Sequence, residues 1–358
     1  MSELFRRPHA RVSAAPLPIA QTFREPPTLL LGRRDTSSEA RLDQQTSDDV
    51  SPMSSRPVIS VVIPAYNYAH VLARAVRSVA NQLDERSELL IIDDGSSDNT
   101  PAVIAELQRE LGNFRSLRQE NGGLASVRNR GITEALGDYL IFLDADDEMA
   151  PGALSTIHRH LEQSPQSRMV IGGYLAKGYE RVVERIPQPL PSDPEERVRG
   201  YLIEKSINIA NGACVMHRDV FTRGLYPERF RNAEDIPVFA QVLANYPCTT
   251  LEQSLAIIHR HDDSLRHQFC YSKEIGIELV EEVFRRLEGN WQSLSKAYYT
   301  QRCLSLFREA YLVDDDASAK HFFLMALKHD WRVILKLSYS RKALRLWLHA
   351  KRKRNRSA

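Results

Sequence analysis

Four short apolar runs, separated by segments with helical spacing, set the strongest limit on how this chain can fold. The first is a continuous β-branched run, 58–63, of the kind found in strands buried on both faces. We expect this strand to end at Pro64. The other runs lie at 89–92, 114–117 and 139–143. Short strands that alternate with helices predict βαβ units, and therefore a parallel, doubly wound sheet.

In such a sheet, ligands bind in the crevice at the carboxyl ends of the strands. The loops after three of the predicted strands carry polar clusters at these ends: Ala65-Tyr66-Asn67, Asp93-Asp94-Gly95 and Asp144-Ala145-Asp146. Because parallel strands end at the same edge of a sheet, we expect the three loops to meet.

The cluster at 144–147 follows an apolar strand and has no basic residue beside it. Neighbouring carboxylates repel one another, and a bound Mg²⁺ or Mn²⁺ relieves that repulsion. In the Asp144/Asp146 pair, one carboxylate can hold the metal while the other meets a ribose or a water ligand. The alternative is the first turn of a helix near Pro151 and Gly152, where acids suit the helix dipole. The residues alone leave both interpretations open.

The second acidic cluster contains Asp93 and Asp94. An acid just past a strand can hydrogen-bond a ribose hydroxyl or the N–H of a base. The alternative is a turn that caps the next helix, which is the role we expect for Asp98. The sequence contains neither GxGxxG nor GxxxxGK[ST], which disfavours ordinary Rossmann dehydrogenases and P-loop ATPases.

In combination and in this order, the clusters resemble a known family. The segments VVIPAYN, IIDDGSSDNT, ENGGLASVRNRGI and FLDADD look like the nucleotide-binding half of family 2 glycosyltransferases, and the resemblance continues at NAEDIPVF and HRHDDSL, over roughly residues 57–266. It implies an α/β chain with the Rossmann-like GT-A fold. This fold has a mixed, mostly parallel sheet flanked by helices, here followed by a C-terminal helical extension.

The resemblance also implies roles for individual residues. Arg128 is expected to neutralise a diphosphate, the alternative being a surface arginine of a helix. The metal, Mn²⁺ or Mg²⁺, is expected at Asp146, with Asp144 and His261 as further contacts. The residues expected to bind the nucleotide sugar, most often a UDP-sugar, are Pro64, Ala65, Tyr66, Asn67, Asp93, Asp94, Gly122, Arg128, Asp144 and Ala145.

Glu234 and Asp235 match the acidic pair of this family, in which an aspartate acts as general base. Inverting sugar transfer needs a carboxylate that takes the proton of the acceptor hydroxyl. We expect Asp235 to be that base and Glu234 to hold a ligand or a loop. The alternative is an N-cap pair for a helix that starts near Pro237. Asn208 and Asn211 are candidate contacts on the acceptor side.

Composition divides the chain into four parts. Residues 1–55 are rich in Pro, Ser, Thr, Gln and Arg and are expected to be disordered. The GT-A domain is expected at 56–270, a helical region at 271–350 and a basic tail at 351–358.

Two further observations concern the cellular compartment of the protein. No apolar run approaches the roughly 18 residues of a membrane span, and arginines interrupt the start of the chain where a signal peptide is apolar. The four cysteines form no CxxC pair, which favours reduced thiols. We therefore expect a cytoplasmic protein.

The formal charge of +2 combines +10 from Lys328 to the end with −8 in the rest of the chain. A nucleic-acid-binding core is therefore not indicated. The basic segment also carries apolar residues at helical spacing, including Trp331, Leu344 and Trp347. It is interpreted either as a helix on an anionic membrane surface, at the inner face of the cytoplasmic membrane, or as a final packed helix with a solvated tail.

The function expected from these observations is inverting, metal-dependent sugar transfer to a hydroxyl of a glycan or lipid-linked acceptor in surface glycan biosynthesis. One alternative is a nucleotidyltransferase, which typically carries a Gly-rich loop with Arg or Lys after the first strand; here that position holds Pro64 to Asn67. The other is an inactive nucleotide-sugar-binding or scaffold protein.

Overall fold

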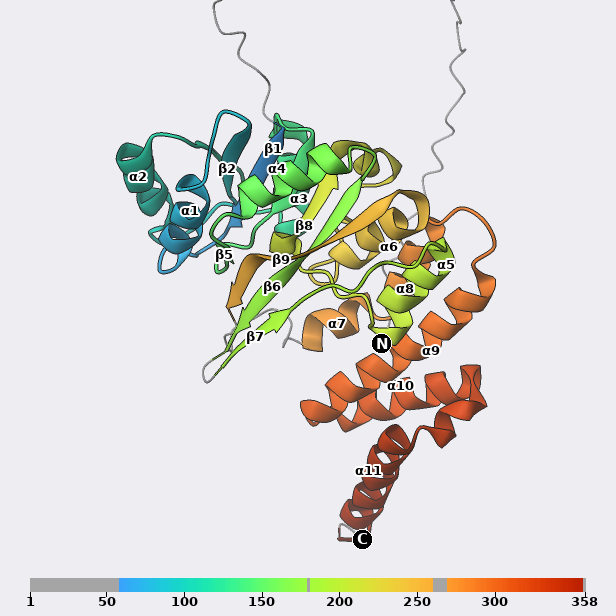
Figure 1. Cartoon of the computed structure of the whole chain (residues 1–358). Helices are drawn as coiled ribbons and strands as arrows, with labels where there is room; N and C mark the ends of the chain where they lie inside the picture. The colour runs from blue at the N-terminus through green and yellow to red at the C-terminus, as the bar shows by residue number, and fades with distance from the viewer. Residues whose placement is uncertain (1–57, 179–180, 260–268, 357–358) are drawn as a thin grey trace, which may run out of the picture. The chain divides into compact units, whose positions relative to one another are not determined.

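The structure, a computed structural model, describes residues 58–178, 181–259 and 269–356 (Figure 1). Residues 1–57, and with them the segment 1–55 that the sequence predicts to be disordered, lie outside the described residues.

The predicted alternation of strands and helices is confirmed in the first half of the domain. Each apolar run forms a strand, and each segment with helical spacing forms a helix. In chain order these are β1 (Ile59–Ala65), α1 (Leu72–Ala80), β2 (Ser87–Asp93), α2 (Thr100–Leu111), β3 (Arg115–Arg118), α3 (Leu124–Glu134) and β4 (Tyr139–Phe142).

The middle of the chain adds further strands and short helices: β5 (Glu148–Met149), α4 (Ala153–Gln163), β6 (Met169–Lys177), β7 (Val182–Arg185), α5 (Pro194–Arg199), η1 (Gly200–Glu204), η2 (Asn211–Ala213), β8 (Cys214–His217), η3 (Arg218–Arg223), α6 (Asp235–Asn245) and β9 (Cys248–His259). The remaining elements are helical: α7 (Phe269–Ile275), α8 (Glu278–Arg285), α9 (Gln292–Leu312), α10 (Asp316–His329), η5 (Trp331–Leu335) and α11 (Leu337–Arg356).

The described strands form one nine-stranded sheet in the order β3-β2-β1-β4-β8-β6-β9-β5, with β7 paired to β6. Strands β3, β2, β1 and β4 are parallel, as predicted, and β8 enters antiparallel beside β4. Helices flank this mixed sheet (Figure 1). The fold is therefore the mixed α/β arrangement expected for GT-A.

One boundary differs from its prediction. Strand β1 does not end at Pro64 but continues to Ala65, which pairs with Asp93 of β2. On the other side, the β4 pairing ends at Val62, opposite Phe142. Proline has no N–H to give to a ladder. At position 64 that costs no bond to β4, because β4 has already ended.

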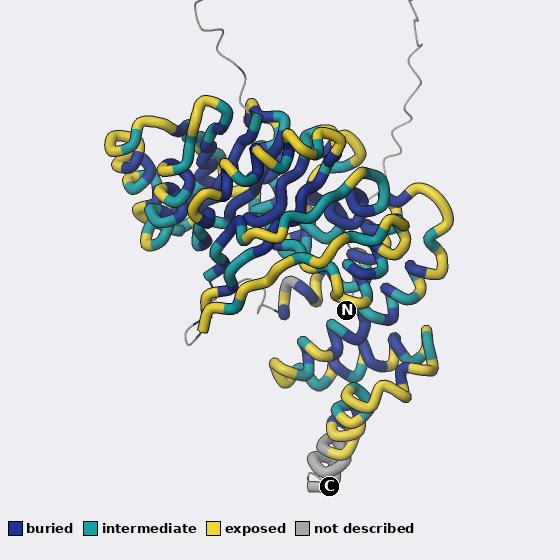
Figure 2. Tube along the Cα trace, in the orientation of Figure 1, coloured by how far each residue is buried: buried dark blue, intermediate teal, exposed yellow. Residues whose placement is uncertain are grey.

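The central strand β1 is buried on both faces, as its β-branched run predicts (Figure 2). Val61 and Ile63 face a core that includes residues of α1, α2 and α4, whereas Val62 faces a second core with residues of α3, α6 and α8. On that second face, a Cβ on Gly131 would stand 2.8 Å from the Val62 side chain. Glycine thus lets α3 pack closely over β1.

The C-terminal helices belong to two cores. Residues of α8 and the first part of α9 join the second core of the sheet, and the rest of α9 packs with α10 and α11 in a third. The domain boundary predicted after residue 270 stays a prediction. All four cysteines are free thiols. Among the described helices, none has the length and apolar character to cross a membrane.

Candidate functional site

The loops after β1 and β2 are joined by hydrogen bonds. The Asp94 amide donates to the Ala65 carbonyl at 2.8 Å. Asn67 takes a left-handed backbone conformation, with φ of 59°, which asparagine tolerates better than most residues. Its side-chain oxygen accepts from the amides of Ser97 and Asp98. Asn67 therefore links the two loops.

Asp94 holds the loop before α3. Its carboxylate accepts from the amides of Gly122 and Gly123 at 2.9 and 2.8 Å, and from the Gln119 side chain at 2.7 Å. Gly123 is the N-cap of α3, so Asp94 satisfies amides at the start of that helix. This arrangement occupies both oxygens of Asp94.

The Asp93 carboxylate is also buried, with 2% of its side chain exposed, but it is less fully bonded. Its Oδ1 accepts from the Ser96 amide at 2.9 Å. Its Oδ2 accepts no hydrogen bond within the described residues and lies 3.4 Å from Nε of Arg118. Of the two neighbouring aspartates, Asp93 retains the capacity to accept a bond from a ligand.

The other residues predicted at this end of the sheet differ in exposure. Pro64 and Ala65 are buried in β1, whereas 46% of Tyr66 is exposed just beyond it. The N-cap of α2 is Asn99 rather than Asp98, but the Asp98 carboxylate accepts from the Thr100 amide at the start of the helix.

The third loop carries Asp144 to Asp147 at the end of β4. Helix α4 begins only at Ala153, with Gly152 at its N-cap, and β5 lies between. The interpretation of these acids as the first turn of a helix is therefore wrong. Asp144 and Asp146 are half-buried, whereas Ala145 and Asp147 are buried.

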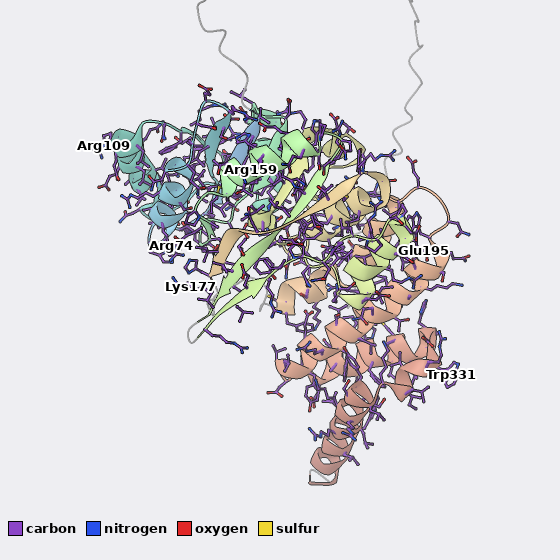
Figure 3. All side chains as sticks on the ribbon, in the orientation of Figure 1. Arg74, Arg109, Arg159, Lys177, Glu195 and Trp331 are labelled. Atoms are coloured by element: carbon purple, nitrogen blue, oxygen red, sulfur yellow. The ribbon has the colours of Figure 1, made fainter. Side chains whose placement is uncertain are left out.

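Two residues that the sequence did not single out contact this loop. The guanidinium of Arg74 on α1 donates to the Asp146 carbonyl and lies 3.5 Å from the Glu148 carboxylate (Figure 3 labels Arg74). Burial raises the pKa of Tyr68, and the charges of Asp146 and its acidic neighbours raise it further. Tyr68 therefore lies in the negative potential of the loop.

The end of β9 reaches the same place. The His259 amide donates to the Asp147 carboxylate at 2.8 Å, and the His259 ring nitrogen lies 2.7 Å from Glu148. His261, the histidine predicted as a metal contact, lies outside the described residues.

Arg128 of α3 joins the third loop to the acidic pair at the start of α6. It is only 1% exposed, so the alternative of a surface arginine is wrong. Its guanidinium donates to Asp144 at 3.1 Å and to Glu234 at 2.5 Å. Burial alone would lower the pKa of Arg128, but the charges of Glu234 and Asp144 raise it above its ordinary value.

Glu234 and Asp235 stand where α6 begins, one residue after a strained turn. Ala233 has φ of 58°, in the left-handed region, a conformation that costs a non-glycine residue roughly 1–3 kcal/mol and is concentrated at functional sites. Glu234 occupies the N-cap position but makes no side-chain cap bond. Burial raises its pKa, which Arg128 opposes and the charge of Asp235 reinforces.

Asp235 is the first residue of α6 and is only half-buried. The Asn211 side chain donates to its carboxylate over 3.5 Å. Helix α6 begins at Asp235, two residues before Pro237, near which the sequence predicted its start. Of the two predicted acceptor-side asparagines, Asn211 lies beside this carboxylate. Asn208 lines a separate cavity of about 630 Å³ bordered by β6, β7 and η1.

The side chains of the third loop provide some of the ligands that a hard cation needs. Among the described residues, no group of three His, Cys, Asp or Glu side chains converges as a metal site. Asp144 and Asp146 offer carboxylate oxygens, the ligands that Mg²⁺ and Mn²⁺ prefer. One or two carboxylates plus substrate phosphates is the usual arrangement for Mg²⁺. The residues present thus fit a cation that shares its coordination with a phosphate ligand.

Loops at the carboxyl ends of parallel strands, two of them with acidic clusters, lie where ligands bind in open α/β sheets. Residues 60–225 match the family described as Glycosyl transferase family 2. Over these residues, a little under half of the chain, the sequence is similar to glycosyltransferase family 2.

Curated relatives match over part of their length. Glycosyltransferase GlyG of Streptococcus pneumoniae is 33% identical over 118 residues, which is 33% of this chain and 39% of the relative. The GalNAc(5)-diNAcBac-PP-undecaprenol beta-1,3-glucosyltransferase of Campylobacter jejuni is 36% identical over 103 residues, 28% of this chain and 33% of the relative. The matches thus span little more than a third of these relatives.

Among solved structures, residues 1–349 of S. aureus TarS in complex with UDP-GlcNAc superimpose with a TM-score of 0.61 at 16% sequence identity. The superposition covers 84% of this chain and 92% of that chain. It extends well past the family match and shows that the two chains share a fold.

Proposed function

We propose that this chain is an inverting glycosyltransferase that moves a sugar from a nucleotide-sugar donor, a UDP-sugar, to a hydroxyl of a glycan or lipid-linked acceptor in surface glycan biosynthesis. The match to glycosyltransferase family 2 supports sugar transfer, and TarS, which shares the fold, has been crystallised with UDP-GlcNAc. The proposed location is the cytoplasm, at the inner face of the membrane where lipid-linked acceptors are available.

The observation that carries the proposal is the double ion pair of Arg128. One guanidinium contacts Asp144 of the loop after β4 and Glu234 beside the proposed base. The donor side and the acceptor side of the reaction are thereby held at one site. Such positioning is a large part of how enzymes lower a barrier.

In the proposed reaction, the acceptor hydroxyl attacks the anomeric carbon from the face opposite the diphosphate, the carbon–oxygen bond to the diphosphate breaks, and Asp235 takes the hydroxyl proton. Asp235 is half-buried at a helix start, where a ligand can reach it. Glu234 is held by Arg128 and acts as a positioning residue.

On the donor side, Asp93 would accept a bond from the nucleoside, next to Ala65 and Tyr66. Asp146 and Asp144 would hold Mn²⁺ or Mg²⁺ together with the diphosphate. When bound, the cation supplies positive charge that stabilises the departing diphosphate. Because Arg128 already pairs with two carboxylates, we assign it to positioning of Asp144 and Glu234 rather than to direct neutralisation of the diphosphate.

A panel of UDP-sugars with Mn²⁺, assayed for release of UDP, tests the proposal. We expect release with at least one sugar, stimulated by an acceptor. Binding of a UDP-sugar without any turnover would favour an inactive nucleotide-sugar-binding protein instead, and absence of both binding and turnover would favour a scaffold.

The two neighbouring aspartates allow a matched comparison. Asp93→Asn is expected to raise the Kd for UDP about tenfold with a smaller change in stability than Asp94→Asn, because its Oδ2 accepts no hydrogen bond within the described residues. Asp94→Asn is expected to lower the free energy of unfolding by about 2 kcal/mol, because its amide nitrogen would face the backbone amide of either Gly122 or Gly123, which now donates to a carboxylate oxygen. Calorimetric UDP titration and urea unfolding of both variants measure this. The opposite pattern would assign the nucleoside contact to Asp94.

Removal of the cation is a further test. EDTA is expected to lower the rate of UDP release by a factor on the order of 10², with recovery on adding excess Mn²⁺. Asp146→Asn should shift the Mn²⁺ concentration for half-maximal rate upward. Asp84→Asn, a change of the same kind at an exposed residue between α1 and β2, serves as the control. A rate indifferent to EDTA would remove the metal from the proposal.

A further inference from the structure

The C-terminal elements hold six large apolar side chains in solvent. They lie on η5 and α11, are between 52 and 67% exposed, and are Trp331, Ile334, Leu335, Leu337, Leu344 and Leu348. In Figure 3, Trp331 is labelled at the outer side of this helical region, and Figure 2 shows exposed residues along η5 and the first part of α11. These six residues are called the C-terminal apolar surface below.

Helix α11 is apolar on two sides. Ala343 and Leu346 are buried in the third core, against α9 and α10. The exposed residues Leu337, Leu344 and Leu348 are separated by seven and four positions, so they lie together on one side of the helix. The interpretation as a final packed helix is thus correct for one side of α11. A surface helix normally keeps its apolar residues on the side that faces the core, so apolar residues on the second side of α11 call for a partner.

Basic side chains flank this exposed side. Arg341 follows Leu337 by four residues, and Arg345 precedes Leu348 by three. Both are exposed, as is Lys336, and none of the three forms a salt bridge within the described residues. From Lys328 onward the sequence holds eleven Lys or Arg and one acid.

We propose that the C-terminal apolar surface and the cations beside it dock this protein on an anionic lipid bilayer. Leucine and tryptophan insert at the boundary between headgroups and acyl chains, while Lys and Arg meet lipid phosphates. Exposed apolar side chains with cations beside them have the chemistry of such an interfacial site.

Charge argues against the other occupants. A second copy would set two segments of +10 against each other, which opposes association. Residues 1–57 carry eight basic and seven acidic groups, so that segment has no excess of negative charge to offer. A nucleic acid would match the cations but would leave the leucines without an apolar partner.

Sedimentation of the full chain with vesicles tests the proposal. Binding to vesicles of phosphatidylcholine with phosphatidylglycerol is expected to be at least about tenfold tighter than binding to phosphatidylcholine alone. The double variant Leu344→Ser/Leu348→Ser is expected to lose about tenfold in affinity for the anionic vesicles. Arg341→Gln/Arg345→Gln is expected to lose a similar factor. Leu136→Ser, which changes an exposed leucine of the sheet domain, should bind like the wild type.

Two results would contradict the proposal. Failure of the full chain to bind anionic vesicles overturns it, as does a leucine variant that binds as tightly as the wild type. Light scattering of the same samples identifies a dimer that the leucine variant disperses, which would assign the surface to a second copy. UDP release in solution, measured on each variant, should be unchanged because these residues lie outside the proposed active site. Docking and sugar transfer can therefore fail independently.

Discussion

Replacing Asp235 by asparagine is expected to lower kcat for sugar transfer by a factor of about 10²–10⁴, the usual contribution of a positioned general base. The amide keeps the shape of the side chain but cannot take the acceptor proton. The Kd for the UDP-sugar should change little, because the donor contacts proposed at Asp93 and Asp146 are untouched. Initial rates of UDP release with acceptor, together with calorimetric binding, separate the two quantities.

A matched control comes from another helix. Asp316 is the first residue of α10, as Asp235 is the first residue of α6, and both are half-buried. Asp316→Asn therefore makes the same change in charge near a helix start without touching the site. It should leave kcat unchanged. If Asp235→Asn turns over like Asp316→Asn, the general base is a different residue.

The fold of the first half could be predicted because its signals are local. The β-branched run at 58–63 has to be buried on both faces, and the alternation with helices then fixes a parallel sheet. Parallel strands bring Asp93 and Asp144 to one edge whatever the details of packing. The strands after residue 150 lacked such signals. Strand β6 contains Gly172 and Gly173, where its pairing with β9 shifts register.

The inner connections of the site could not be predicted, because they depend on contacts distant in sequence. Arg128 and Glu234 are 106 residues apart, and only the packing of the second core, which holds residues of both α3 and α6, brings them together. Arg74 binds a backbone carbonyl, which leaves no pattern in the sequence. Likewise, the sequence could not assign different roles to Asp93 and Asp94. The difference is that the Gly122 and Gly123 amides donate to the carboxylate of Asp94 and not to that of Asp93.

The largest expected effect on stability comes from Arg128→Met. The variant removes a buried cation and leaves the Glu234 carboxylate, 7% exposed, without its partner. Breaking a buried ion pair from one side costs about 3–5 kcal/mol, because the remaining charge stays in a poorly solvated site. Urea unfolding should show that loss in the free energy of unfolding, and UDP release should fall as Asp144 and Glu234 lose their common anchor.

Arg130→Met is the matched control on the same helix. Its ion pair with Glu134 spans 3.8 Å at a partly exposed site, so the variant should lose no more than about 1 kcal/mol. Equal losses of unfolding free energy for the two variants would mean that the ion pairs of Arg128 stabilise the fold no more than an exposed ion pair does.

A double variant tests whether Arg128 only compensates the charge of Glu234 or also positions the groups of the proposed active site. Adding Glu234→Gln to Arg128→Met removes the stranded carboxylate, so part of the lost stability should return, and the double-mutant cycle should report a coupling of more than about 1 kcal/mol. Activity should not return, because Asp144 and the start of α6 still lack the guanidinium that joins them. Recovery of stability without recovery of UDP release is the signature of a residue whose role is to position both sides of the reaction. Recovery of both would reduce Arg128 to charge compensation for Glu234.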